Sequence, residues 1–133
     1  MKYIKRTTEG ILVLEKEARY LTKGLKQFMN EACIQNLSTF EGRKQAAQII
    51  LNHTSNLPIY VDEDTIMFPT KSIRNYDCIY VNYHQVLSLK ETIGGSTRIV
   101  FNDLSEIKVD TSIVKMRKQL FRAQTIFKAK NTY

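Results

Sequence analysis

The stretch STFEGRKQAAQIILNH, residues 38–53, predicts the central helix of the fold. Ser38 is followed three residues later by Glu41, which is the capping-box pattern of a helix start. Alanine, isoleucine and leucine residues then supply the body of the helix. Gly42, Arg43 and Lys44 fall within the first turns, where a glycine weakens a helix, so these three residues need an explanation.

Around this helix, the apolar pattern predicts a mostly antiparallel sheet. Short apolar or alternating runs bounded by turn residues predict strands at residues 10–15, 57–61, 65–69, 78–82, 86–93, 97–102 and 105–110. Residues 24–37 fit a helical face only in part. Residues 112–128, capped by Thr111 or Ser112, predict a basic carboxyl-terminal helix with one apolar stripe. We therefore expect an α+β fold in a single domain, residues 1–133.

The distribution of charge favours a polyanionic partner. The formal net charge is +7, and residues 111–133 contain six lysine and arginine residues without any acidic residue. Residues 31–110, in contrast, carry more acidic than basic side chains. A basic segment on a nearly neutral body is typical of nucleic-acid-binding proteins, although a solvated lysine-rich helix has the same composition.

Other protein classes lack support in the sequence. The chain contains no nucleophile elbow, phosphate loop or metalloprotease motif, so we expect no enzymatic activity and no cofactor. Cys33 and Cys78 are expected to be reduced core thiols, and their spacing to His53 and His84 does not indicate a metal site. No apolar run resembles a signal peptide or a membrane span, so we expect a cytoplasmic protein without membrane contact.

Three sequence blocks resemble those of the competence transcription factor family, the ComK-like proteins of Gram-positive bacteria. The blocks are STFEGRK, LPIYV and MFPTKSIRNYDCIYVN, in this order. The family typically has two cysteines that flank a Ser-aromatic-x-Gly-Arg-Lys block, a Pro-Ile strand and a Phe-Pro-Thr-x-Ser block. The matching residues here are Cys33, Ser38, Phe40, Gly42, Arg43, Lys44, Pro58, Ile59, Phe68, Pro69, Thr70, Ser72 and Cys78. The resemblance is good over residues 9–85 and loose beyond them.

The resemblance implies a ComK-like DNA-binding domain that activates transcription at A/T-rich promoter boxes, usually with more than one subunit. Ile79-Tyr80 stands where the family has a tryptophan after the second cysteine. Full-length members also carry a tail through which an adaptor delivers them to a protease. The chain ends at Tyr133, so we question adaptor–protease control. Residues 78–120 have a fainter similarity to the LytTR-type DNA-binding domain.

The expected partner is double-stranded DNA, with contacts from the central helix, a loop and the final helix. A helix amino terminus offers free N–H groups to a phosphate, which Gly42 would admit; alternatively, Gly42 only packs against a strand. Cations on the loop at residues 69–75 would enter an A/T-rich minor groove, unless this loop is an ordinary connection. The expected contacts are Arg43, Lys44, Lys71, Ser72, Arg74, Asn75, Lys115, Lys118 and Arg122. A truncated, non-activating module that modulates a related regulator and an RNA-binding protein are the alternatives.

Overall fold

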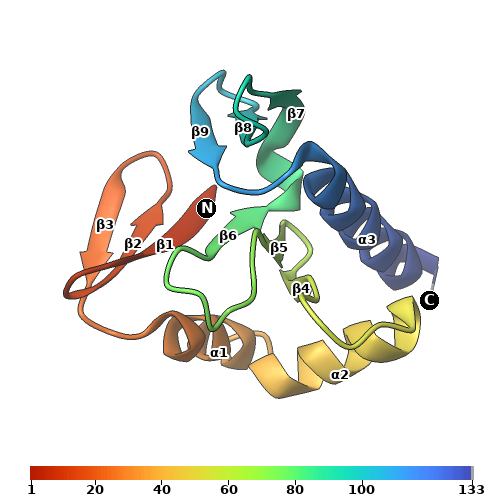
Figure 1. Cartoon of the computed structure of the whole chain (residues 1–133). Coiled ribbons are helices and arrows are strands. Elements are labelled where there is room, and N and C mark those ends of the chain that lie inside the picture. Colours follow the sequence, from red (N-terminus) through yellow and green to blue (C-terminus); the bar gives the residue numbers. More distant parts are fainter. Residues whose placement is uncertain (133) are drawn as a thin grey trace.

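The computed structural model describes residues 1–132, which form two antiparallel sheets and three α-helices (Figure 1). The strands of the large sheet are, in spatial order, β3 (Ala18–Leu21), β2 (Gly10–Leu14), β1 (Tyr3–Thr7), β6 (Ile79–Asn82), β5 (Thr65–Pro69) and β4 (Ile59–Asp62). The small sheet contains β7 (Val86–Glu91), β8 (Thr97–Phe101) and β9 (Glu106–Val109). A short 3-10 helix, η1 (Tyr83–Gln85), connects the two sheets. The predicted α+β fold is confirmed.

Helices and the small sheet enclose the large sheet from both faces (Figure 1). The helix α1 (Leu25–Ile34) buries Leu25 and Met29 in a first core on one face. The helix α3 (Ile113–Thr132) and the small sheet fill a second core on the other face. The helix α2 (Phe40–Leu51) lies beside β4 and contributes side chains to both cores.

The strand β5 separates these two cores. All five of its residues are buried, and successive side chains of a strand point to opposite faces. Met67 accordingly lies in the first core, whereas Ile66 and Phe68 lie in the second. The neighbouring strand β4 is less regular, because its pairing with β5 shifts register between Tyr60 and Asp62.

The structure contains two amino-terminal strands, β1 and β3, that the sequence did not predict. The predicted strand at residues 10–15 is β2, whereas β1 and β3 had no clear apolar pattern. Three of the four residues of β3 are exposed, and its pairing with β2 defines it as a strand. Gly10 lies so close to the end of β3 that an added Cβ atom would clash with the carbonyl oxygen of Leu21. Residues 24–37, which the sequence left open, contain α1.

The cap of α2 differs from the predicted capping box. Thr39 is the N-cap residue, and its Oγ1 accepts a hydrogen bond of 2.9 Å from the Gly42 amide. Glu41 instead forms an ion pair of 3.1 Å with Lys26, so the pairing of Ser38 with Glu41 was wrong. A Cβ atom on Gly42 would lie 3.1 Å from Thr39 Oγ1. The glycine therefore leaves room for the cap, and its amide is already occupied rather than open to a phosphate.

The carboxyl-terminal helix α3 is longer than the predicted helix at residues 112–128. Ser112 caps it, because the amide of Lys115 donates a hydrogen bond of 3.3 Å to Ser112 Oγ. The hydroxyl of Thr111 has another role and donates to the carbonyl oxygen of Thr70 at 3.0 Å. This bond joins the start of α3 to the segment that follows β5.

Both cysteines are buried free thiols of the first core, as predicted. Burial raises the pKa of the Cys33 and Cys78 thiols, because a thiolate is poorly solvated there. Over residues 1–132, no helix has both the length and the apolar character needed to cross a lipid bilayer.

We predict that Thr39→Ala lowers the free energy of unfolding by about 1 kcal/mol, since it removes the side chain that caps α2. Ser38→Ala is the matched control and should change stability by less than about 0.5 kcal/mol. Denaturant unfolding monitored by circular dichroism measures both values. An equal loss for the two variants would contradict the assignment of Thr39 as the cap.

Candidate nucleic-acid interface

The loop between β5 and β6, residues 70–78, is held in one conformation by its own hydrogen bonds and by Arg6. The Asn75 amide donates to the carbonyl oxygen of Ser72 at 2.9 Å, and the Asp77 amide donates to Asn75 Oδ1 at 2.9 Å. From β1, the Arg6 guanidinium donates to the carbonyl oxygens of Ile73 and Asn75 at 2.6 and 2.7 Å. Such a two-point contact fixes the loop relative to the sheet.

Three of the predicted DNA contacts line one cavity of about 250 Å³. Lys44 reaches it from α2, while Ser72 and Arg74 reach it from the β5–β6 loop. The segment of residues 54–57, which follows α2, completes its rim. The fold therefore brings together side chains that are almost thirty residues apart in the sequence.

The buried residue Gln119 ties α3 to this cavity. Its Nε2 donates hydrogen bonds of 2.8 Å each to the carbonyl oxygens of Asn56 and Pro69. One turn further, Arg122 donates to Gln119 Oε1 at 3.1 Å and contacts His53 Nε2 at 2.7 Å. A guanidinium can only donate, so His53 accepts in this contact. These bonds hold α3, and with it Arg122, against the segment that forms the rim of the cavity.

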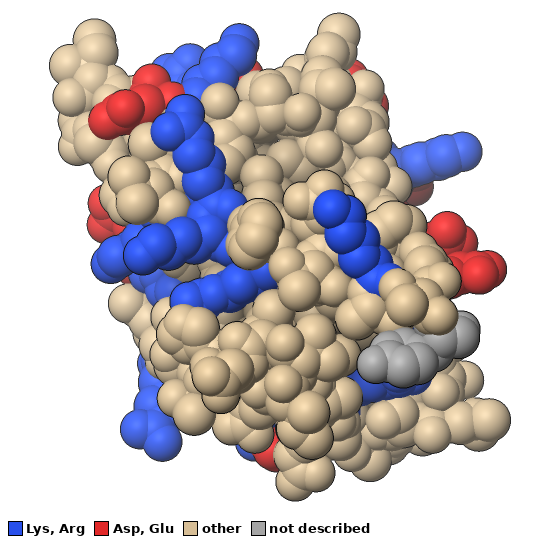
Figure 2. All heavy atoms as spheres, turned by 90° about the vertical axis from the view of Figure 1, so that its right-hand side faces the viewer, with Lys and Arg blue, Asp and Glu red and all other residues tan. Residues whose placement is uncertain are grey.

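Most of these cations have no acidic partner. Lys71 lies 3.5 Å from Asp110, whereas no ion pair within residues 1–132 includes Lys44, Arg74 or the cations of α3. Figure 2 views the side formed by α3 and shows lysine and arginine side chains gathered on one part of it. We use the term basic face for the predicted contact residues of α2, the β5–β6 loop and α3 that remain available: Lys44, Lys71, Ser72, Arg74, Lys115, Lys118 and Arg122.

Two predicted contacts are engaged elsewhere. The Arg43 guanidinium lies 5.0 Å from the ring centroid of Tyr60 and donates to the carbonyl oxygen of Asn36 at 3.3 Å. It lines a different cavity from Lys44, although the two residues are adjacent. The carbonyl and side-chain oxygens of Asn75 are used to hold the β5–β6 loop. We therefore leave Arg43 and Asn75 out of the basic face.

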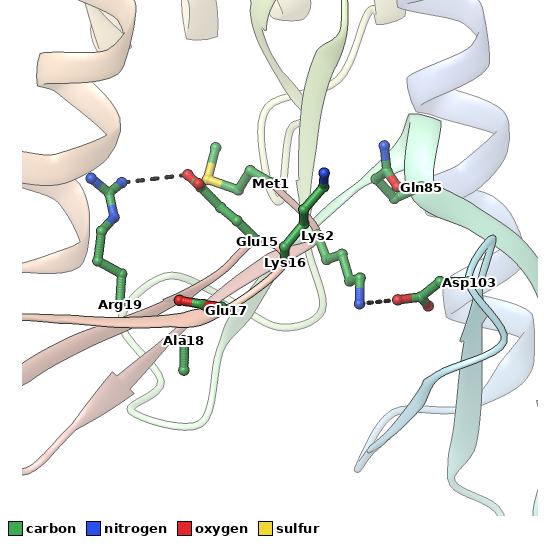
Figure 3. A pocket seen from close by; sticks show the side chains of 9 residues that line it. All are labelled: Met1, Lys2, Glu15, Lys16, Glu17, Ala18, Arg19, Gln85 and Asp103. Carbon is green, nitrogen blue, oxygen red and sulfur yellow. Dashed lines mark hydrogen bonds and ion pairs between the residues drawn. The ribbon is translucent and has the colours of Figure 1, made fainter.

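A larger cleft, of about 770 Å³, lies between β1–β3 and the small sheet (Figure 3). Its charges are mixed, because Lys2 pairs with Asp103, and Arg19 with Glu15. Hydrogen bonds from Lys2 and Ser105 lower the pKa of Asp103 to about 2. The two ion pairs neutralise charges of both signs at the mouth of the cleft, so it offers little attraction to a polyanion.

Arg6 and Gln119 are the two residues that the sequence analysis missed. Arg6 lies on a strand without an apolar pattern, and its acceptors are backbone carbonyls, which leave no trace in a sequence. Gln119 did leave a signal, because it falls on the same helical stripe as the buried residues Met116, Ala123 and Ile126. A glutamine at an apolar position is a sign of a buried polar contact.

Comparisons with known proteins give one match. A family model described as ComK protein matches residues 2–131, almost the whole chain. Neither the search of curated proteins nor that of solved structures found a match.

We predict that Arg6→Ala releases the β5–β6 loop, so amide hydrogens of residues 70–78 should exchange at least several-fold faster. The loss of two charge-assisted hydrogen bonds should also lower the free energy of unfolding by about 1–3 kcal/mol. Lys5→Ala, the neighbouring exposed cation on β1, is the matched control and should leave exchange in the loop unchanged. Identical exchange in both variants would show that Arg6 does not hold the loop.

Proposed function

We propose a function for this chain, which belongs to the ComK protein family, a family of competence transcription factors. In our proposal the chain regulates transcription by binding duplex DNA through the basic face, and it prefers A/T-rich promoter boxes. The protein has no enzymatic role in this proposal, and it acts in the cytoplasm with DNA as its partner.

One observation carries the proposal: Lys44 of α2 and Arg74 of the β5–β6 loop line one cavity to which Gln119 joins α3, and Lys71 is the one basic-face cation with an acidic partner within residues 1–132. A cation without an acidic partner keeps its full attraction for phosphate, and the release of condensed counterions drives its binding to DNA. The elements that carry these cations are connected by Gln119 and Arg6, so their spacing is already set before DNA binds. A preset spacing lowers the entropic cost of association.

Within the basic face, we assign different tasks to the loop and to α3. Arg74 is exposed on a loop that Arg6 holds in place, which is the arrangement needed to insert a guanidinium into a narrow A/T-rich minor groove. Lys115 and Lys118 are exposed on the helix α3 and suit contacts with phosphates. The loop would thus give sequence preference, and the helix would give affinity.

The cavity itself offers no exposed aromatic side chain on which the bases of single-stranded RNA or DNA could stack. Proteins that bind single strands stack the bases on exposed aromatic side chains. The aromatic residues that line this cavity are Phe40 and Tyr80, which are 5% and 3% exposed. They contribute to the first core and have no free face for a base. Mobility shifts with A/T-rich duplex, G/C-rich duplex and single-stranded probes test the proposal directly.

We predict that the logarithm of the association constant for duplex DNA falls linearly with the logarithm of the salt concentration. The slope should become steeper by about 0.9 for each phosphate contact. Lys115→Ala should reduce this slope by about one, because it removes one contact. Lys16→Ala makes the same change of charge on the far turn between β2 and β3 and should leave the slope unchanged. A flat plot for the unmodified chain would refute binding through phosphate contacts.

We also predict that Arg74→Ala weakens binding to an A/T-rich duplex by about 1–3 kcal/mol and binding to a G/C-rich duplex by much less. Lys118→Ala should weaken both duplexes by the same factor, since phosphates carry no sequence information. Fluorescence anisotropy titrations at one salt concentration compare the six affinities of the unmodified chain and the two variants for both duplexes. Equal losses of Arg74→Ala on both duplexes would remove the minor-groove role from the β5–β6 loop.

A further inference from the structure

A second surface of α3 is built differently from the basic face. A groove of about 710 Å³ runs between the end of α2 and α3, and we refer to it as the α2–α3 groove. Its residues are either apolar or basic, with a single threonine in addition. They are Ile50, Leu51, His53, Val114, Arg117, Lys118, Phe121, Arg122 and Thr125.

The apolar side chains of the α2–α3 groove are unusually open to solvent. Phe121 is 69% exposed, Val114 is 59% exposed and Ile50 is 42% exposed. Val114 and Phe121 are seven residues apart on α3, which places them on the same side of the helix two turns apart. Large apolar side chains that gather in one concave surface are the usual mark of a site that another molecule covers.

The charges around the α2–α3 groove indicate the chemistry of that molecule. Arg117, Lys118 and Arg122 line it together with His53, and no acidic residue is among the lining residues that the structure describes. Electrostatic complementarity therefore requires an acidic occupant, and the apolar floor requires one with an apolar side. A DNA backbone supplies the negative charge, but it would place phosphates against Phe121 and Val114. The apolar surface of these two side chains would then not be buried against another apolar surface, so the hydrophobic effect would contribute nothing to binding.

We propose that the α2–α3 groove is the docking site for an acidic amphipathic helix of a partner protein. Such a helix would place its apolar stripe on Ile50, Val114 and Phe121, in the mode by which grooves between helices bind amphipathic segments. Its carboxylates would face Arg117, Lys118 and Arg122. This proposal goes beyond DNA binding, although Lys118 and Arg122 belong to both surfaces.

The test uses a designed peptide of about 15 residues with leucines on one helical face and glutamates elsewhere, and a scrambled peptide of the same composition. Fluorescence anisotropy with the full chain should show that the patterned peptide binds at least about tenfold more tightly than the scrambled one. Phe121→Ala should abolish this difference. Tyr20→Ala removes an aromatic side chain of similar exposure, 72%, from β3 and should preserve it. Val114→Ser provides a second variant of the groove if Phe121→Ala does not fold.

The same variants separate this proposal from DNA binding. Phe121→Ala should leave the affinity for duplex DNA unchanged, because Phe121 is not part of the basic face. A loss of DNA affinity in Phe121→Ala would assign the groove to the DNA interface and overturn the proposal. Equal binding of the two peptides would overturn it as well, since charge alone would then explain the attraction. These outcomes are independent of whether Lys115→Ala weakens DNA binding.

Discussion

The complete burial of β5 is the constraint on which the rest of the structure depends. Because both faces of this strand are covered, the sheet needs a layer on each side, and α1 and α3 supply these layers. The last residue of β5 also serves the basic face, since the carbonyl oxygen of Pro69 accepts a hydrogen bond from Gln119. The strand therefore organises both cores and positions the helix that carries three of the seven residues of the basic face.

The sequence predicted those elements whose apolar residues have a clear period. The central helix, the hairpin of β4 and β5 and the strands of the small sheet follow this rule, and their approximate positions were confirmed. The strand β3 could not be predicted in this way, because three of its four residues face solvent. The strand β1 has no clear alternation of apolar and polar residues either. Long-range pairing with β2 stabilises β3, and such pairing leaves no local pattern.

The fold brings together some predicted contact residues from separate segments and separates two that are adjacent in the sequence. Lys44, Ser72 and Arg74 line one cavity. Arg43 and Lys44 formed one basic pair in the sequence, yet successive helical residues point about 100° apart, and Arg43 lies over Tyr60. The role of Gly42 beside the cap of α2 was not predicted either. This role depends on which of the two adjacent hydroxyl groups, that of Ser38 or that of Thr39, caps the helix.

The two thiols of the first core are unreactive while the core stays closed. Alkylating agents and oxidants react with the thiolate, and Cys33 and Cys78 have both a raised pKa and no contact with solvent. Cys33 lies on α1, whereas Cys78 ends the β5–β6 loop and donates its S–H to the carbonyl oxygen of Lys71 at 3.2 Å. A reagent can therefore modify these thiols only after α1 or the β5–β6 loop has moved away from the core. The rate of thiol labelling therefore measures how often each part of this core opens.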